Sequence, residues 1–315
     1  MDPVFKEAIW GGTKLRDVFD YEIPSDTTGE CWAISGHANG MSRVAGGRFD
    51  GKTLGELWNE EPEIFGNYPG SQVPLLIKII DAKNDLSIQV HPDDAYAQQY
   101  EHEPNGKTEM WYILEAEPGA SLIYGFSKPM QPEQLDTCLK ENTILSYLQK
   151  IPVKKGDVFL IPAGTVHAIG AGIVLAEIQQ SSNLTYRLYD YNRTDATGKK
   201  RPLHIEKAKA VIQFSASQPP KTKQPMQQKD GYQVQCLCKC PYFCTTLLTI
   251  QTACDWTDYQ PDSDTFQVLL CISGSGTIQT KENALSFQKG DCIFLPAHGS
   301  MERLTGTAEL LQITG

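Results

Sequence analysis

The chain has 315 residues, a hydrophobic content of 40% and a formal net charge of −10, since 38 acidic residues outnumber 28 lysines and arginines. These values are typical of a folded globular protein of about two domains, and the acidic balance argues against nonspecific nucleic-acid binding, which needs clustered basic residues. Because apolar runs stay well short of the roughly 20 residues of a membrane span, and the N-terminus lacks a signal-peptide pattern, we expect a cytoplasmic protein that binds neither nucleic acid nor membrane, with its oligomeric state unknown.

The first 70 residues are rich in turn-forming residues and predict one helix, over 53–66. Thr53 and Glu56 form a capping box, in which each side chain satisfies a backbone N–H at the start of a helix. Leu54 and Leu57 begin an apolar stripe behind this cap, as expected of a helix with one buried face.

The pattern changes to short strands between residues 73 and 191. Short apolar segments separated by glycine, proline and asparagine are typical of an all-β sandwich or barrel. The predicted strands are Val73–Ile80, Asp85–His91, Glu109–Glu117, Ser121–Phe126, Gly156–Pro162, Gly172–Gln180 and Thr185–Tyr191. Apolar residues at helical spacing predict further helices over 132–150 and 202–214.

A polar, proline-rich stretch without periodicity covers residues 215–230 and predicts a linker. Strands resume after it. We therefore expect two β-domains, one over 1–214 and one over 231–315.

A short internal repeat links the two predicted domains. The segment GDVFLIP at 156–162 reappears as GDCIFLP at 290–296, and in each copy a Gly-Asp turn leads into an apolar strand that stops at a proline. The first copy continues to His167, whereas Met301 occupies the equivalent position in the second. The C-terminal domain is therefore predicted to be a structural copy without metal ligands.

Nine cysteines are too few, and odd in number, for a disulfide framework. Four of them lie close together, at Cys236, Cys238, Cys240 and Cys244. Strand periodicity places the first three on one face as small apolar side chains. This favours a buried strand over a metal cluster, because structural zinc sites usually combine two separated ligand pairs.

Three separate segments carry residue types that can bind a divalent metal. Alternation on a strand places Gln89 and His91 on one face, which taken alone could be a solvent face. Glu109 opens an apolar strand two residues after Lys107, and His167 follows a proline-containing turn; each has a structural explanation of its own. Together, two imidazoles, a carboxylate and an amide oxygen form a mixed ligand set suited to a catalytic metal.

Two charged residues lie in strands that are otherwise apolar. Lys78 needs a partner if it is buried, and either a substrate phosphate or snorkelling to the strand end would satisfy it. Glu177 shares strand parity with Leu175 and could face inward, although an exposed glutamate is the simpler interpretation of that strand alone.

These segments resemble known family signatures. The pattern Gly156, Pro162, Gly164, His167 is similar to a cupin motif, and the stretch 76–93, which contains Gln89-Val-His91-Pro-Asp, resembles the signature of type I mannose-6-phosphate isomerases. Further matches follow in order: Phe5-Lys6-Glu7, Trp10-Gly11-Gly12, Glu30-Cys-Trp32, Gly106-Lys107-Thr-Glu109-Met110, Arg187-Leu-Tyr-Asp190 and Gly198-Lys-Lys-Arg201-Pro-Leu-His204. The resemblance implies a mainly β fold of two cupin-like jelly-roll β-domains with a small helical insertion.

The resemblance also implies a site with one zinc ion (Zn2+) per chain. By position, the metal ligands are Gln89, His91, Glu109 and His167; the catalytic residues are Arg187, Glu177 and Lys107; and the substrate-binding residues are Lys78 and Ser87. Many members have His-Lys-Pro-Glu where this chain has Gly106-Lys107-Thr108-Glu109, so no role passes to a histidine before that lysine.

The implied function is the zinc-dependent interconversion of mannose 6-phosphate and fructose 6-phosphate, an aldose–ketose isomerisation through an enediol, with a small-molecule sugar phosphate as partner. An iron-dependent cupin oxygenase is one alternative, because two histidines and a carboxylate also form its metal site. A non-catalytic cupin that binds sugar phosphate is the other.

Overall fold

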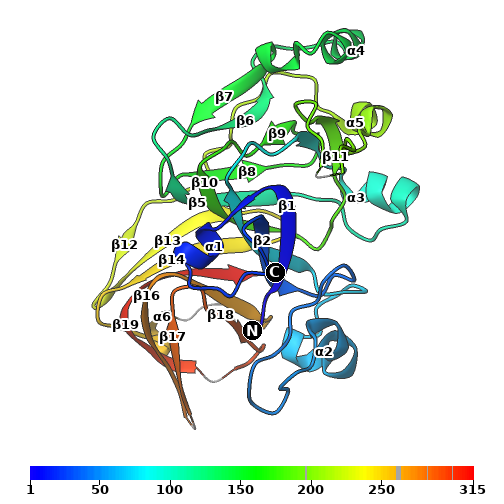
Figure 1. Cartoon of the computed structure of the whole chain (residues 1–315). Helices are drawn as coiled ribbons and strands as arrows, with labels where there is room; N and C mark the ends of the chain where they lie inside the picture. The colour runs from blue at the N-terminus through cyan, green and yellow to red at the C-terminus, as the bar shows by residue number, and fades with distance from the viewer. Residues whose placement is uncertain (196, 260–263, 282, 300) are drawn as a thin grey trace.

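Antiparallel β-sheets dominate the structure, a computed structural model that describes residues 1–195, 197–259, 264–281, 283–299 and 301–315 (Figure 1). Sheet 1 has the order β1-β2-β3-β10-β5-β8, with strands Val4–Gly12, Thr28–Ser35, Leu75–Ala82, Ile173–Gln180, Glu109–Ala116 and Val158–Ile161. Sheet 2 has the order β11-β4-β9-β6-β7, with strands Tyr186–Tyr189, Ile88–Val90, His167–Ala168, Ser121–Phe126 and Leu148–Pro152. Sheet 3 has the order β12-β13-β14-β19-β16-β17, with strands Gln227–Gln228, Tyr232–Lys239, Cys244–Ile250, Met301–Thr314, Gln267–Thr280 and Ala284–Gln288. In addition, β15 (Ala253–Asp255) pairs with β19, and β18 (Cys292–Leu295) pairs with β16.

The helices are short and lie around the sheets, with α4 and α5 beside sheet 2 at the top of Figure 1. They are α1 Lys14–Asp17, α2 Leu54–Glu60, η1 Pro62–Phe65, α3 Asp94–Tyr96, η2 Ala97–Glu101, α4 Pro132–Lys140, η3 Ile144–Ser146, α5 Ile205–Val211 and α6 Trp256–Tyr259. The predicted capping box is present at α2, where Thr53 and Glu56 satisfy each other's backbone N–H groups. In the described parts of the chain, none of the helices is both long and apolar enough to span a membrane.

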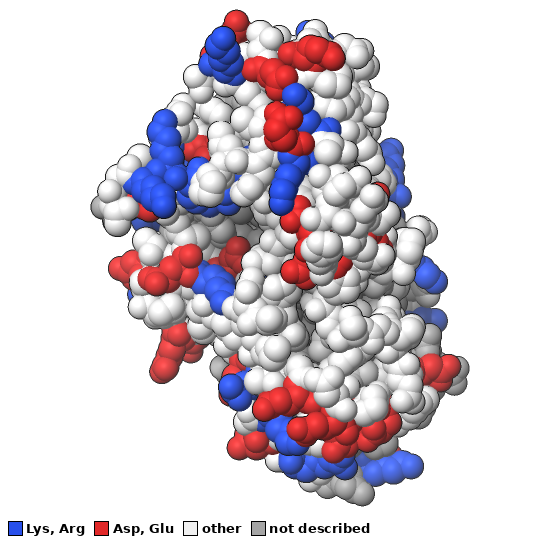
Figure 2. All heavy atoms as spheres, turned by 90° about the vertical axis from the view of Figure 1, so that its right-hand side faces the viewer, with Lys and Arg blue, Asp and Glu red and all other residues white. Residues whose placement is uncertain are grey.

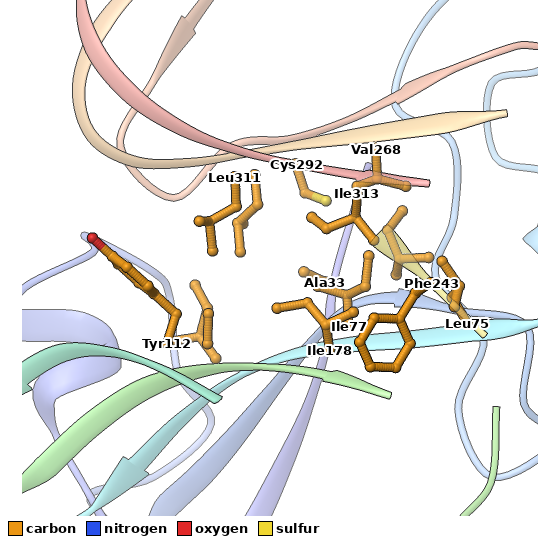
Figure 3. Close-up of a cluster of buried hydrophobic side chains, with 14 of the residues drawn as sticks. Ala33, Leu75, Ile77, Tyr112, Ile178, Phe243, Val268, Cys292, Leu311 and Ile313 are labelled. Atoms are coloured by element: carbon orange, nitrogen blue, oxygen red, sulfur yellow. The ribbon is translucent and has the colours of Figure 1, made fainter. Parts of the chain in front are cut away.

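The central strands β2, β3, β10 and β5 of sheet 1 are buried on both faces, which explains why they are largely apolar. All eight residues of β3 are buried. Leu75 and Ile77 share one core with Leu311 and Ile313 of the C-terminal strand β19 (Figure 3). Alternate residues point the other way, so Lys78 faces the interior between sheets 1 and 2.

The strands divide into two groups along the chain. β1 to β11 form sheets 1 and 2, and β12 to β19 form sheet 3, which has a further core of its own around Leu269 and Phe287. The helices α4 and η3 are inserted between β6 and β7. The predicted mainly β fold of two jelly-roll β-domains with a small helical insertion is thus confirmed.

The internal repeat folds into the same turn in both β-domains. Gly156 and Gly290 have φ angles of +87° and +95°, a region that favours glycine. In each turn the carboxylate of the following aspartate accepts a hydrogen bond from a backbone N–H, at 2.9 Å and 2.8 Å. Each turn leads into a short strand, β8 or β18. The strand after that begins with His167 in the first copy (β9) and with Met301 in the second (β19), so the second copy has no imidazole at this position.

The prediction of one helix and turns for the first 70 residues is incomplete. The predicted helix over 53–66 consists of α2 and the separate helix η1, and the segment also contains α1. It further contains β1 and β2, which pair with each other and join sheet 1 through β3. The alternation of β1 is disturbed by two register shifts and by Gly11 and Gly12, and glycine weakens any strand signal.

The later helices are shorter than predicted. In the segment 132–150, α4 ends at Lys140, and the strand β7 begins at Leu148 and pairs with β6. A short apolar run fits either kind of element, so the periodicity continued past the true end of the helix. In the segment 202–214 the helix α5 begins only at Ile205. The predicted linker also contains the two-residue strand β12.

The expected common face of Cys236, Cys238 and Cys240 is also wrong. A register shift falls between Cys236 and Cys238 in the pairing of β13 with β14. As a result Leu237 and Cys238 are both fully buried, whereas Cys236 is only half-buried. A β-bulge of this kind inserts an extra residue and so interrupts the alternation of faces.

Candidate active site

Sheet 2 places three of the predicted site residues in one row across neighbouring strands. Arg187 of β11 lies opposite Gln89 of β4, and Gln89 lies opposite His167 of β9. Arg187 Nε also donates a hydrogen bond to Ser87 Oγ at 3.2 Å. Because alternate residues of a strand share a face, Ser87, Gln89 and His91 all point from β4 toward sheet 1.

Sheet 1 presents a second row of polar side chains toward the first. Lys78 of β3 lies opposite Glu177 of β10, which lies opposite Trp111 of β5. Lys78 Nζ is 3.0 Å from Glu177 Oε1, and Trp111 Nε1 donates to Glu177 Oε2 at 3.0 Å. Lys107 Nζ lies 3.7 Å from Glu177 Oε1 and donates to Glu109 Oε2. The row is therefore an alternating network of buried cations and carboxylates.

The two sheets meet at His91, Glu109 and His167, whose ligand atoms all lie within 4.8 Å of one another. His91 Nε2 is 3.6 Å from Glu109 Oε2, and His167 Nε2 is 3.4 Å from Glu109 Oε1. The three residues are at most 1% exposed. The Gln89 side chain adjoins this triad, with its Nε2 3.4 Å from His167 Nε2.

The donor atoms of this triad fit a divalent metal. His91 Nδ1 is 2.7 Å from the Leu184 carbonyl oxygen, and His167 Nδ1 is 2.8 Å from the Thr165 carbonyl oxygen. A carbonyl partner requires a proton on Nδ1, so the Nε2 of each ring is unprotonated and carries the lone pair that a metal would bind. Glu109 Oε1 is buried without a hydrogen-bond donor, and such an atom needs a cation or a donor to compensate its burial.

Burial and neighbouring charges set the protonation states at the triad. Burial and Lys107 lower the pKa of His167 to about 4 and that of His91 well below its usual value. Burial and Glu177 raise the pKa of Glu109 to about 7. Burial alone would raise the pKa of Glu177 as well, but Lys107 and Lys78 outweigh it and lower this pKa to about 2. Both imidazoles are therefore neutral at neutral pH, the form that binds metals.

A polar cavity of about 300 Å³ adjoins the triad. Its walls combine four lysine or arginine groups with carboxylates, polar groups and a smaller apolar part, and include Trp10, Glu30, Lys78, Ser87, Gln89, Lys107, Glu177, Asn183, Thr185, Arg187 and Arg201. Figure 2 shows basic and acidic side chains intermixed on one face of the molecule, with a hollow between a basic and an acidic group. A cavity with these walls suits a small, charged, hydroxyl-rich molecule.

All nine side chains predicted for the site lie at the triad or in the cavity beside it. Lys107 and Glu109 are buried, not an exposed edge pair, and Glu177 is only 3% exposed. Lys78 does not snorkel to a strand end but pairs with Glu177 inside the barrel.

Glu30 and Arg201 also line the cavity, although the sequence motifs that contain them indicated no role for either residue. Glu30 Oε2 is 3.4 Å from Lys78 Nζ and accepts a hydrogen bond from Trp32 Nε1 at 2.5 Å. The alternation of Glu30 and Trp32 could have shown that they share a face, but only once β2 is recognised as a strand. Arg201 lies in an irregular segment, where no periodicity indicates the direction of a side chain.

A jelly roll that encloses a metal-competent triad beside a polar cavity places this protein among the enzymes of the cupin class. Comparisons with known proteins identify a narrower family within that class. Residues 1–118 match the family model for the catalytic domain of type I phosphomannose isomerase, and residues 234–314 match the cupin domain of mannose-6-phosphate isomerase.

Whole-chain comparisons agree with these matches. A mannose-6-phosphate isomerase of Bacillus subtilis (strain 168) is 42% identical over 309 residues, covering 98% of this chain and 96% of that protein. A mannose-6-phosphate isomerase of Streptococcus mutans is 40% identical, covering 98% of this chain and 97% of that protein. A crystal structure of a B. subtilis mannose 6-phosphate isomerase has a TM-score of 0.94 and 39% identity, covering 99% of this chain and 98% of that one. The chain belongs to the type I mannose-6-phosphate isomerases.

Proposed function

We propose that this isomerase uses one zinc ion per chain to interconvert mannose 6-phosphate and fructose 6-phosphate through an enediol. The observation that carries the proposal is the convergence of His91, Glu109 and His167 beside a polar cavity with basic walls. Membership of the mannose-6-phosphate isomerase family supports the choice of substrate.

The metal would be held by His91, Glu109 and His167, with Gln89 as a fourth ligand through its amide oxygen. Two neutral imidazoles with one or two oxygen ligands are a donor set that suits zinc, and three or four protein ligands leave a position for substrate. When bound, zinc would supply Lewis-acid polarisation of the sugar carbonyl without redox chemistry. The Lys107 ammonium contacts Glu109 and lies 3.1 Å from His91 Nε2, so a positive charge at this position is compatible with the ligand set.

The substrate would be bound by Lys78, Ser87 and Arg187. A sugar phosphate brings a charge of about −1.5 to −2 at neutral pH, and the chain itself carries −10. Attraction must therefore be local, and these three side chains line the same cavity. Arg187 keeps its charge at every relevant pH, so we assign it the stabilisation of negative charge that develops on the sugar during isomerisation.

Proton transfer would use Glu177 and Lys107. Aldose–ketose isomerisation moves a proton between neighbouring carbons and needs a positioned acceptor. Glu177 is an ionised carboxylate in the cavity wall, which places it to accept the proton from one carbon and return it to the next. The Lys107 ammonium, 3.7 Å from Glu177 Oε1, is placed to donate to the developing oxyanion.

The catalytic unit would be the segment 1–214, since every residue assigned above lies in sheets 1 and 2 or in their connecting loops. The segment 231–315, beyond the linker 215–230, would act without metal ligands of its own. Among the described residues, no second cluster of histidine, cysteine and carboxylate ligands accompanies the triad.

A coupled assay for fructose 6-phosphate formed from mannose 6-phosphate tests the function. We expect activity that disappears on chelation and returns with zinc, and that does not depend on oxygen. The variant His91→Ala should bind less than one zinc per chain and lose activity. Full activity of this variant after verified metal removal would refute the site, and oxygen-dependent turnover would instead indicate a cupin oxygenase.

A further inference from the structure

The loop that carries Lys107 is attached to the chain segment that follows His91. Lys107 N donates to the Pro92 carbonyl oxygen at 2.9 Å, and Gly106 N donates to Asp94 Oδ1 at 2.7 Å. A Cβ atom on Gly106 would lie 2.3 Å from the carbonyl carbon of Asp93, so the two backbones are in direct contact and only glycine fits. The segment that follows His91 is thereby joined to the loop that precedes Glu109 by main-chain contacts.

Asp94 holds a second group besides this loop. Its Oδ1 also accepts a hydrogen bond from Gln180 Nε2 at 2.7 Å, and Gln180 Oε1 accepts one from Thr108 N at 2.9 Å. Asp94 and Gln180 therefore bind the backbone N–H groups on either side of Lys107. The family pattern with proline in place of Thr108 would lack the donor for Gln180, because proline has no N–H.

The same carboxylate lies beside the C-terminal β-domain. Burial and the nearby Asp94 carboxylate raise the pKa of the hydroxyl of Tyr242, which comes from the turn between β13 and β14. Both residues line a cavity of about 350 Å³ together with Tyr68 and Gln180. This cavity is separate from the substrate cavity, and the two have no lining residue in common.

We propose that Asp94 is a positioning residue that sets the place of Lys107 and Glu109, and that Tyr242 connects this clamp to the C-terminal β-domain. The inference rests on the proposed roles of Lys107 and Glu109. It assigns the C-terminal β-domain a part in catalysis beyond covering sheet 1, although that domain has no ligand in the triad.

The variant Asp94→Ala tests the clamp, with Asp94→Asn as the conservative comparison. Misplacement of a catalytic group lowers the rate steeply, so we expect kcat with mannose 6-phosphate to fall about tenfold in Asp94→Ala. KM should change less than about twofold, because Lys78 and Ser87 still bind the substrate. Asp94→Asn should recover most of kcat, since its amide oxygen still accepts from Gly106 N–H.

Hydrogen exchange provides a measurement that does not depend on activity. We expect faster exchange of the amides of 106–108 in Asp94→Ala, at an unchanged thermal unfolding midpoint. Unchanged exchange would show that Asp94 does not hold the loop. Faster exchange with an unchanged kcat would show that the loop position does not matter for the reaction. Either result would overturn the proposal.

Tyr242→Phe tests the connection to the C-terminal β-domain, with Tyr68→Phe as its matched control. Both tyrosines line the same cavity, and both substitutions remove one hydroxyl. We expect faster exchange of 106–108 and a lower kcat in Tyr242→Phe alone. Identical behaviour of the two variants would overturn the connection. An inactive wild-type chain would instead refute the proposed function, while the exchange data would still decide whether the clamp exists.

Discussion

The charge balance of the site depends on Glu109. Its carboxylate is fully buried, has one oxygen without a hydrogen-bond donor, and lies between two neutral imidazoles and the Lys107 ammonium. An isolated buried carboxylate is unfavourable unless a cation compensates it. This explains why a residue that begins an otherwise apolar strand is acidic, and why both a lysine and metal-competent histidines surround it.

Glu109→Gln should nearly abolish zinc binding and activity. The amide keeps the shape but loses the negative charge and one good metal donor. Changes in residues that only support metal ligands already cost about 10–100-fold in affinity or activity, so we expect a loss of more than about 100-fold here. Zinc content after dialysis and kcat are the measurements. Glu117→Gln is the control, because that side chain is 62% exposed and pairs with Lys14 at the surface; a similar loss there would contradict the assignment.

Lys78→Met should destabilise the fold and weaken substrate binding. Removal of one member of a buried ion pair leaves an uncompensated charge on Glu177, which typically costs about 3–5 kcal/mol. Because Lys107 also faces Glu177, we expect the lower end of that range. Urea denaturation measures the stability, and KM for mannose 6-phosphate should rise. The exposed Lys83→Met is the matched control, and equal effects of the two substitutions would argue against a buried role for Lys78.

At the scale of elements, the junction between β11 and α5 holds Arg187 in place. Arg187 N donates to His204 Nδ1 at 3.2 Å, and His204 N donates to the Arg187 carbonyl oxygen at 2.8 Å. His204 is also the N-cap residue of α5. Protonation of Nδ1 would remove the acceptor, so the junction depends on a neutral imidazole.

This junction should make stability fall on acidification. Burial, Arg187 and Lys207 lower the pKa of His204 below its usual 6.5. Below pH 6.5 the unfolded chain then binds this proton more readily than the folded one, so the contribution of His204 is present at higher pH and is lost as the pH falls. In urea denaturation at pH 7.5 and 5.5, the wild-type chain should lose more stability than His204→Asn, whose amide oxygen accepts without titrating. Equal losses would show that His204 does not titrate in this way.

Local periodicity predicted which faces of the strands are functional, but not which strands meet. The common face of Ser87, Gln89 and His91 follows from alternation within one strand, and the structure has it. The neighbourhood of Gln89 and His167, which are 78 residues apart, depends on strand pairing that no local pattern encodes. The resemblance to a known family supplied that step. Glu30 was given no role because β2 was not predicted as a strand, so its common face with Trp32 was not recognised.

At the scale of the whole molecule, sheet 1 has the site on one face and the C-terminal β-domain on the other. Ile178 of β10 packs toward that domain, and its neighbour Glu177 faces the substrate cavity. Because the two positions are adjacent on one strand, we expect removal of packing on the far face to move the backbone that carries Glu177. We therefore predict that the catalytic strands and the C-terminal β-domain unfold as one cooperative structure.

Phe266→Ala tests this coupling from the C-terminal side. Phe266 is fully buried and packs against the rings of Phe65 and Phe294, so that it joins the two parts of the chain. Truncation of a buried phenylalanine typically costs about 3–5 kcal/mol. If the molecule unfolds as one unit, the amides of β3 should lose protection against hydrogen exchange together with those of β16. The exposed Leu285→Ala should leave both strands within about 0.5 kcal/mol of the wild type. Loss of protection in β16 alone, with β3 unchanged, would mean that the catalytic sheets are stable without the C-terminal β-domain and that the coupling is absent.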